Sequence, residues 1–439
     1  MITKENKKLA QWAQEFALKN GCEATRLALF NGSSSSFDVR DMKIDRLHQA
    51  SENNLVIQLF TNGRFGSYST NRLDKTEIEK LILDGIAATR YLAPDAARAL
   101  PDASRYYKGG GADLQLLDPD FDKVQPDDKV ALAMQTCEEI VGKDSRIISA
   151  TTSYSDEKVF KYLLTSNGFE GETSASSFGI SASVSVHGEG EARPESYWYE
   201  SSLYYNDLEK KGIGEKALER VLRKIGQKKI ASGKYTMVVD NRNAPRLLSP
   251  LLDAIDGVNI QQQNSFLLDK LQQQVVSEKL TLIDEPHLVK ASGARYFDNE
   301  GIATHRQPIF DKGILQLYFI DTYRANKMQT TPTISSPSIL TMEMGNKNAE
   351  GLIADIDKGI LVTGFNGGNC NSTTGDFSYG IEGFLIQNGK LAQPISEMNV
   401  TGNMLTLWSN LAVIGNDPRL SSPWRIPSLV FEGVDFSGL

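Results

Sequence analysis

The sequence predicts an α+β fold in two domains, built mainly from antiparallel sheets with flanking helices. Its 439 residues are about twice what one hydrophobic core usually organises, which favours two domains. Asparagine–glycine pairs at residues 62–63, 167–168 and 388–389, and Asp311-Lys312-Gly313, indicate hairpins because these residues tolerate the φ angles of tight turns. Helical and strand patterns occur in both halves, without a repeat of fixed period.

Five segments have the spacing of amphipathic helices. The first covers residues 4–20 and ends at Gly21, with an apolar stripe formed by Leu9, Trp12, Ala13, Phe16 and Leu18. The second begins after Asp74, whose side chain is expected to cap it, with Glu77 at the capping-box position. The third, at residues 127–143, places Cys137 on its apolar side and therefore in the core. The fourth covers residues 214–230, and the fifth is an apolar run that ends at Ile255.

Residues 178–186 have the alternation of a half-buried strand. Phe178, Ile180, Ala182, Val184 and Val186 face one way, whereas glycine and serine side chains face the other. This pattern is typical of an antiparallel sheet with one solvated face. A fresh strand pattern begins just after residue 230, so we predict one domain at residues 1–230 and a second at residues 231–439.

Composition and charge exclude several classes of protein. The net charge is −8 and the basic residues are dispersed, so the chain lacks the positive stripe needed for direct binding to nucleic acid. No apolar segment is long enough to span a membrane, and the N-terminus has no apolar signal core. We therefore expect a cytoplasmic protein without membrane contact. Its three cysteines, Cys22, Cys137 and Cys370, are widely spaced and are expected to be reduced.

The histidines do not have the spacing of a metal site on a helix. His48, His187, His287 and His305 are too far apart in the sequence for an HExxH motif. His187-Gly188-Glu189 matches the HxE of zinc deaminases, but no PCxxC follows it. The chain also lacks a GxSxG elbow, an SxxK motif and a phosphate-binding GxxxxGK[ST] loop.

The stretch GGNCNSTTGDFSYG at residues 367–380 has the composition of a functional loop. Its glycines permit tight turns and its Asn and Thr side chains can satisfy turn amides, so a purely structural loop is one interpretation. A second is an edge that receives an extended peptide, with Asp376 and Glu382 orienting it. A third is nucleophilic catalysis by Cys370, although no helix begins at this thiol. The candidate peptide-binding or interface residues are Asn369, Cys370, Thr374, Gly375, Asp376 and Ser378.

Four longer segments resemble the TldD/PmbA peptidase family, which also carries the label "modulator of DNA gyrase". They are NSFLLDKL (264–271), FDNEGIATHRQPIFDKGILQLYFIDTYRANKM (297–328), TTGDFSYGIEGFLIQNGKLAQPISEMNVTGN (373–403) and AVIGND (412–417). Their order and spacing together make the resemblance specific, and it is strongest from about residue 232 onward. In this family, TldD-type chains carry an HExxxH motif on a helix at the start of the C-terminal domain, with a further cysteine ligand near the C-terminus.

This chain departs from that metal motif. In the segment NAPRLLSPLL, Asn243, Ala244 and Leu248 stand where the resemblance places His, Glu and His. Residues 232–286 contain no histidine, and residues 415–439 contain no cysteine. The chain thus resembles the TldE (PmbA) type, which implies no catalytic residue, no metal ligand and no cofactor in this chain.

The resemblance implies a partner and a substrate class. We expect a TldD-type metallopeptidase subunit as partner in a heterodimer, with the metal-bearing chain cleaving unfolded or modified peptides in a shared cleft. Two alternatives remain open. One is a noncatalytic homodimer that binds peptides or another protein. The other is an autonomous hydrolase that uses Cys370 or a loop serine.

Overall fold

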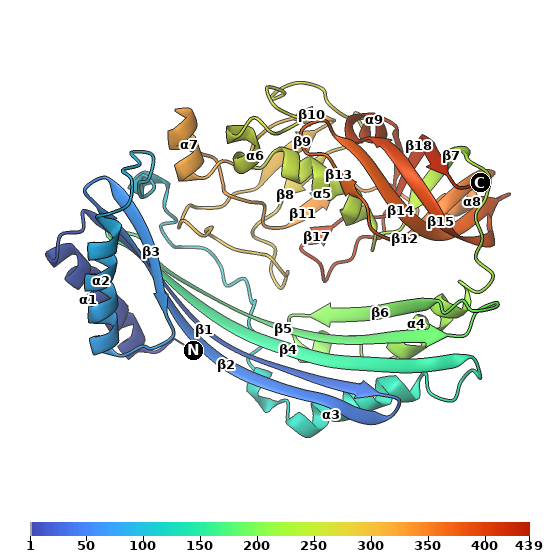
Figure 1. The fold of residues 1–439 in the computed structure, drawn as a ribbon, viewed down its shortest axis with the longest axis horizontal. Coiled ribbons are helices and arrows are strands. Elements are labelled where there is room, and N and C mark those ends of the chain that lie inside the picture. Colours follow the sequence, from blue (N-terminus) through green and yellow to red (C-terminus); the bar gives the residue numbers. More distant parts are fainter. Residues whose placement is uncertain (1) are drawn as a thin grey trace.

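The N-terminal half is organised around one long, curved antiparallel sheet (Figure 1). The computed structural model describes residues 2–439. Six strands pair in the order β3-β2-β1-β4-β5-β6. Their bounds are β1 Ala24–Arg40, β2 Lys43–Thr61, β3 Arg64–Thr70, β4 Ile147–Thr165, β5 Glu170–Val186 and β6 Glu195–Ser202. The predicted hairpins at Asn62-Gly63 and Asn167-Gly168 are confirmed, joining β2 to β3 and β4 to β5.

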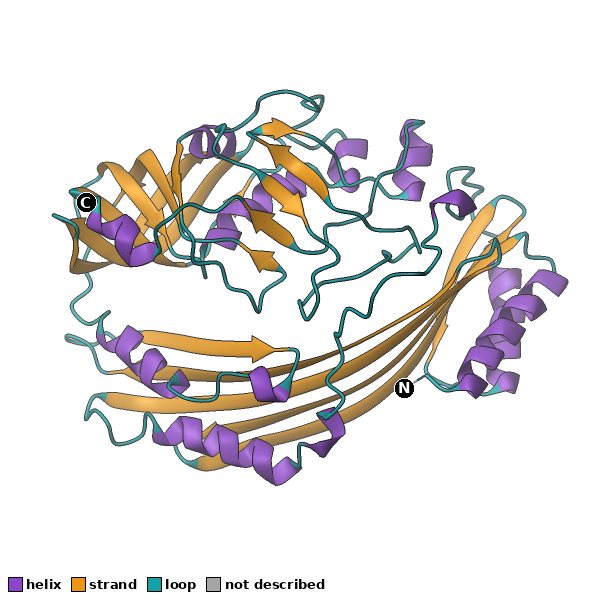
Figure 2. Cartoon of the chain, turned by 180° about the vertical axis from the view of Figure 1, so that it is seen from behind, coloured by secondary structure: helices purple, strands orange, loops and turns teal. Residues whose placement is uncertain are grey.

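Helices cover one face of this sheet at its two ends (Figure 2). At one end α1 (Lys4–Lys19) and α2 (Lys75–Thr89) pack on Leu27, Leu29 and Ile57, and at the other α3 (Pro126–Glu138) and α4 (Ile213–Leu222) pack on Phe37, Phe178 and Ile180. The alternation predicted for residues 178–186 is confirmed, because its five apolar side chains are all buried. Short 3₁₀ turns lie at Ala103–Arg105, Phe121–Lys123 and Tyr205–Asp207.

Three predicted helix ends or faces need correction. The third helix ends at Glu138 rather than residue 143, because the chain leaves the helix at Glu139 and Gly142 adopts a φ of 78°. The fourth helix ends at Leu222 rather than residue 230, because the chain turns there and Gly226 adopts a φ of 79°. In α1 the fully buried positions are Ala10, Ala13 and Ala17, and Leu18 is exposed. The predicted caps hold: Asn20 closes α1 before Gly21, and Glu77 N donates to Asp74 Oδ1 over 2.9 Å.

In the C-terminal half, a ring of strands closes on itself. The order runs β12-β7-β18-β15-β14, and β14 pairs back onto β12, while β13 continues the sheet beside β14 and β16 pairs with β18. Their bounds are β7 Gly233–Val239, β12 Lys358–Phe365, β13 Asn369–Cys370, β14 Asp376–Gln387, β15 Lys390–Asn403, β16 Leu411–Ile414 and β18 Leu429–Ser437. The predicted Asn388-Gly389 hairpin joins β14 to β15.

A smaller sheet and short helices complete this half. The sheet order is β10-β9-β8-β11-β17, and the predicted turn at Asp311-Lys312-Gly313 joins β9 to β10. The strands are β8 Leu282–Asp284, β9 Gln307–Asp311, β10 Ile314–Leu315, β11 Leu340–Met342 and β17 Trp424–Arg425. The helices are α5 Ala244–Ala254, α6 Gly257–Gln261, α7 Thr322–Met328, α8 Ala349–Ala354 and α9 Met404–Ser409. The predicted α+β class with mainly antiparallel sheets is confirmed, whereas the domain boundary at residue 230 stays a prediction.

Aromatic and cationic side chains join the two halves. Tyr106 and Phe297 pack on Phe169 with ring centroids 5.1 Å away in each case. At the other end of the contact, the Arg242 guanidinium lies 3.5 Å from the Trp198 ring centroid, and its Nη2 is 2.6 Å from Glu200 Oε1. These contacts place the start of α5 against β6. Within the described residues 2–439, no helix is long and apolar enough to cross a membrane.

We expect Phe169→Ala to destabilise the protein by about 3–5 kcal/mol, because this ring is 2% exposed and fills the junction between the halves. Urea unfolding followed by tryptophan fluorescence measures the change. Tyr91→Ala is the matched control, since Tyr91 is 91% exposed and its loss should change the free energy of unfolding by less than about 0.5 kcal/mol. Equal effects of the two substitutions would contradict the assignment of Phe169 to a joint core.

Candidate functional site

Helix α5 stands at the centre of the candidate site. It begins after Asn243, whose Nδ2 donates to Asp240 Oδ1 over 2.7 Å and to Thr363 O over 2.9 Å. Trp408 Nε1 donates to Leu247 O over 3.1 Å and holds the opposite side of the helix in the core. The apolar residues of α5 pack against the strand ring, which confirms the apolar helix predicted before Ile255.

The side chains of α5 do not fit a hydrolytic metal. Ala244 and Leu248 are 0% exposed and pack in the hydrocarbon core, and neither carries a donor atom. Asn243 uses its amide nitrogen to hold Asp240 and Thr363. Across residues 2–439, no three His, Cys, Asp or Glu side chains gather as a metal-binding group.

The exposed face of α5 carries polar side chains that meet the loop at residues 366–376. Arg246 Nη2 donates to Gly368 O over 3.3 Å, and its guanidinium lies 5.0 Å from the Tyr379 ring centroid. Further along the helix, Ser249 Oγ donates to Asp253 Oδ2 over 3.4 Å, and burial raises the pKa of Asp253. Sequence reasoning missed Arg246 and Asp253. Ser249 and Asp253 follow Arg246 by three and seven residues, which is the spacing of one face of a helix. This polar spacing in the sequence could have identified them.

The loop is held by close backbone packing and its own hydrogen bonds. Gly368 has a φ of 85°, and a Cβ there would lie 2.0 Å from Ser378 O, so the close approach requires glycine. Asn371 Oδ1 accepts from Thr373 N over 2.9 Å and from Thr374 N over 3.2 Å. These contacts support the structural role predicted for the glycines and the Asn side chains of the loop.

The predicted site residues lie on β13, on the start of β14 and in the turn between these strands. Asn369 pairs with Ser378 across β13 and β14, and both are exposed. Asp376 accepts from Thr374 Oγ1 over 2.8 Å and from Asn403 Nδ2 over 3.0 Å, and these bonds lower the pKa of Asp376. Gly375 is buried, and its carbonyl accepts from Met404 N. No contact tests whether these residues bind a peptide or a subunit, so their role stays a prediction.

Cys370 lacks the surroundings of a catalytic nucleophile. It is half-buried in β13, and its Sγ lies 3.7 Å from Asn371 O. Burial, followed by the charges of Asp376 and Asp253, raises the pKa of its thiol to about 11. The four histidines are exposed, and His287 Nε2 lies 3.1 Å from Thr304 Oγ1. The thiol is therefore protonated at neutral pH.

We expect iodoacetamide to alkylate Cys370 about a hundredfold more slowly at pH 8 in the folded protein than in guanidinium chloride, because the folded thiol has a pKa of about 11 against 9.0 for an ordinary thiol. The folded-state rate should rise as pH approaches 11. Mass spectrometry of the peptide that contains Cys370 separates it from Cys22 and Cys137, both of which are buried. A folded rate equal to that of the unfolded chain at pH 8 would contradict this environment.

Comparisons with known proteins agree with the fold and with the quoted motifs. Three family models match, described as PmbA/TldA metallopeptidase domain 1 at residues 28–89, the central domain at residues 119–225 and the C-terminal domain at residues 232–438. Together they cover most of the chain.

Relatives match over nearly the whole length. "Metalloprotease PmbA" of Escherichia coli O157:H7 is 25% identical over 420 residues, which is 95% of this chain and 92% of that protein. A crystal structure of a candidate modulator of DNA gyrase from Bacteroides thetaiotaomicron is 66% identical, covers 100% of both chains and has a TM-score of 0.98. TldE from Thermococcus kodakarensis shares the fold, with a TM-score of 0.82 at 18% identity over 98% of this chain and 100% of that one. The chain therefore belongs to the PmbA/TldD family of metallopeptidase-like proteins.

Proposed function

We propose that this protein is the metal-free, TldE-type subunit of a two-subunit peptidase that acts on unfolded or modified peptides. The single observation that carries the proposal is the chemistry of α5, where Ala244 and Leu248 are buried in hydrocarbon at the positions where the family resemblance places the Glu and the second His of the metal motif. A metal-activated water needs imidazole or carboxylate ligands that converge on one ion. Helix α5 contains no histidine, and its one carboxylate, Asp253, belongs to no group of three or more candidate ligands among residues 2–439. A second chain would therefore have to provide the hydrolytic centre.

The loop at residues 366–376 supports a binding role within such an assembly. Asn369 and Ser378 are exposed on β13 and β14, and β13 forms the end of its sheet. An exposed strand edge offers backbone groups to an extended peptide or to another subunit. We propose that Asn369, Cys370, Thr374, Gly375, Asp376 and Ser378 line this contact and that bond cleavage occurs in the metal-bearing partner.

The name "modulator of DNA gyrase" belongs to a relative and does not require contact with DNA here. This chain has a net charge of −8 with dispersed basic residues. Phosphate-backbone binding depends on clustered positive charge. An effect on DNA topology through proteolysis of another protein is consistent with this charge, and we propose a cytoplasmic location for the same activity.

We expect the isolated chain to leave an unfolded casein substrate intact and to support its cleavage after a TldD-type chain with an HExxxH motif is added. Gel analysis of fragments measures cleavage, and size-exclusion chromatography with light scattering measures the mass of the mixture. The control replaces the partner's motif glutamate by glutamine, which should abolish cleavage but preserve the complex.

Three outcomes would contradict this proposal. The first is cleavage by the isolated chain that persists in a metal chelator. The second is a mixture in which the two chains elute separately, with this chain as a homodimer that still binds peptides. The third is cleavage by the isolated chain that disappears on Cys370→Ala, which would assign the chemistry to the thiol. Because Cys370 is half-buried within the loop at residues 366–376, the thermal midpoint of this variant is measured alongside.

A further inference from the structure

Strand β5 has an open edge over the first part of its length. β4 pairs with β5 from Glu170 onward, whereas β6 pairs only with residues Phe178–Ser185. Among the described residues, no strand lies against the other side of β5 at residues 170–177. This edge lies in the N-terminal half, apart from α5 and the loop at residues 366–376.

The register determines which backbone groups face the open side. Ser176 N donates to Leu116 O over 3.0 Å, so the backbone of Ser176 points away from β4. The pairing of β5 with β4 continues without a bulge through Ser174 and Glu172. Backbone direction alternates along an antiparallel strand, so the N–H and C=O groups of Glu172 and Ser174 also point outward. No hydrogen bond to another segment of the described chain satisfies these groups.

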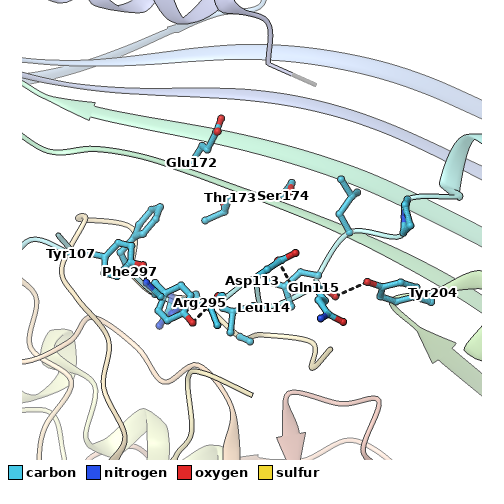
Figure 3. A pocket seen from close by; sticks show the side chains of 17 residues that line it. Tyr107, Asp113, Leu114, Gln115, Glu172, Thr173, Ser174, Tyr204, Arg295 and Phe297 are labelled. Atoms are coloured by element: carbon cyan, nitrogen blue, oxygen red, sulfur yellow. Dashed lines mark hydrogen bonds between the residues drawn. The ribbon is translucent and has the colours of Figure 1, made fainter. Parts of the chain in front are cut away.

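Open space adjoins these unpaired groups. Three cavities of about 590, 610 and 400 Å³ meet here, and Thr173 and Ser174 line all three. Such volumes are typical of ligand pockets, which measure ~300–1,000 Å³. Figure 3 shows Thr173 pointing toward Tyr107 and Phe297 across the pocket, while Glu172 and Ser174 project from the other side of the strand.

The pocket wall opposite the strand edge is apolar and aromatic. Tyr107 and Tyr296 stack with ring centroids 5.1 Å apart, and Phe297 lies 6.1 Å from Tyr107. Leu114 and Leu116 extend the same wall. A strand added to β5 would direct alternate side chains toward this wall, which is how strand addition combines backbone affinity with side-chain selectivity.

Lys161 supplies an unpaired positive charge at the same place. It lies directly opposite Thr173 on the same face of the sheet and lines two of the three cavities. Its Nζ donates to Asn299 Oδ1 over 2.6 Å and forms no ion pair with a carboxylate of the described residues. Burial, followed by the charges of Arg26 and Arg295, lowers the pKa of Lys161. An incoming carboxylate beside Thr173 would offset that repulsion.

We propose that the open edge at Glu172–Ser174 is a peptide-binding site, at which an extended peptide pairs with β5 and places an acidic side chain against Lys161. The assignment extends the proposed function, because it adds a capture site for peptides outside the loop at residues 366–376. Binding of a peptide at this edge does not depend on the proposed function. Only the later cleavage of the bound peptide by a metal-bearing partner rests on it.

The test compares two variants that differ in one backbone donor. Ser174→Pro removes the outward N–H without touching a hydrogen bond to β4, whereas Ser174→Ala keeps the N–H and removes only the hydroxyl. The probes are two labelled octapeptide libraries, randomised except for a fixed central glutamate or glutamine. We expect Ser174→Pro to weaken binding of the glutamate library about fivefold to tenfold, and Ser174→Ala to change it less than about twofold, by fluorescence anisotropy.

Lys161→Met tests the charge. It should weaken binding of the glutamate library about tenfold and leave binding of the glutamine library unchanged, since it removes only the charge-assisted contact. Thermal midpoints of all variants establish that they are folded.

A measurement on the unsubstituted protein tests the proposal even if the proline variant fails to fold. The amides of Glu172 and Ser174 should exchange more slowly with deuterium when the glutamate library is added, whereas the amide of Ser176 is already bonded to Leu116 O and should not change. Equal binding by Ser174→Pro and Ser174→Ala, or the absence of new protection at Glu172 and Ser174, would overturn the proposal. These measurements use this chain alone, so they fail independently of the pairing with a metal-bearing subunit.

Discussion

The pairing of β12 with both β7 and β14 is the constraint on which the C-terminal half depends. By closing the ring of strands, it leaves one continuous apolar surface on which α5 must pack. Helix α8 covers a separate apolar cluster, where Val238, Leu361 and Val430 meet Leu352 and Ile353. Because protein interiors are close-packed, the side of α5 that faces the ring must carry apolar side chains. Ala244 and Leu248 fill that side, so this side of the helix contributes stability to the core and carries no side chain that could bind a metal.

Backbone hydrogen bonds explain where unpaired strand edges remain. A closed ring leaves few unpaired edges, so the open end of this seven-stranded sheet is at β13, beside the loop at residues 366–376. The N-terminal sheet is open, and β6 covers only part of β5. The edge at Glu172–Ser174 is therefore left facing cavities instead of a neighbouring strand. Natural sheets normally cover or blunt such edges, which makes an uncovered one within a pocket a functional feature to test.

The junction between the halves fixes the position of the β5 edge relative to β13. Arg242 lies over Trp198 and pairs with Glu200, and Phe169 and Phe297 pack at the far end of the same junction. Arg242 and Trp198 hold β6 against the start of α5. The aromatic cluster holds β4 and the turn before β5 against residues 296–302. These contacts join the half that carries the β5 edge to the half that carries β13.

The sequence by itself determined the α+β class, the hairpins at Asn62-Gly63 and Asn388-Gly389, the cap at Asp74 and the absence of histidine from α5, because these depend on local periodicity, turn chemistry and residue identity. The sequence also showed the resemblance to the family, because the order and spacing of the motifs can be compared without a structure. It extended the fourth helix too far, because apolar spacing continues past Leu222 while Gly226 turns the chain. Only the tertiary structure decided that Arg246 reaches Gly368, that burial raises the pKa of Cys370, and that β6 stops short of Glu172–Ser174. Those features depend on which distant segments meet, and neither periodicity nor composition records the length over which two strands pair.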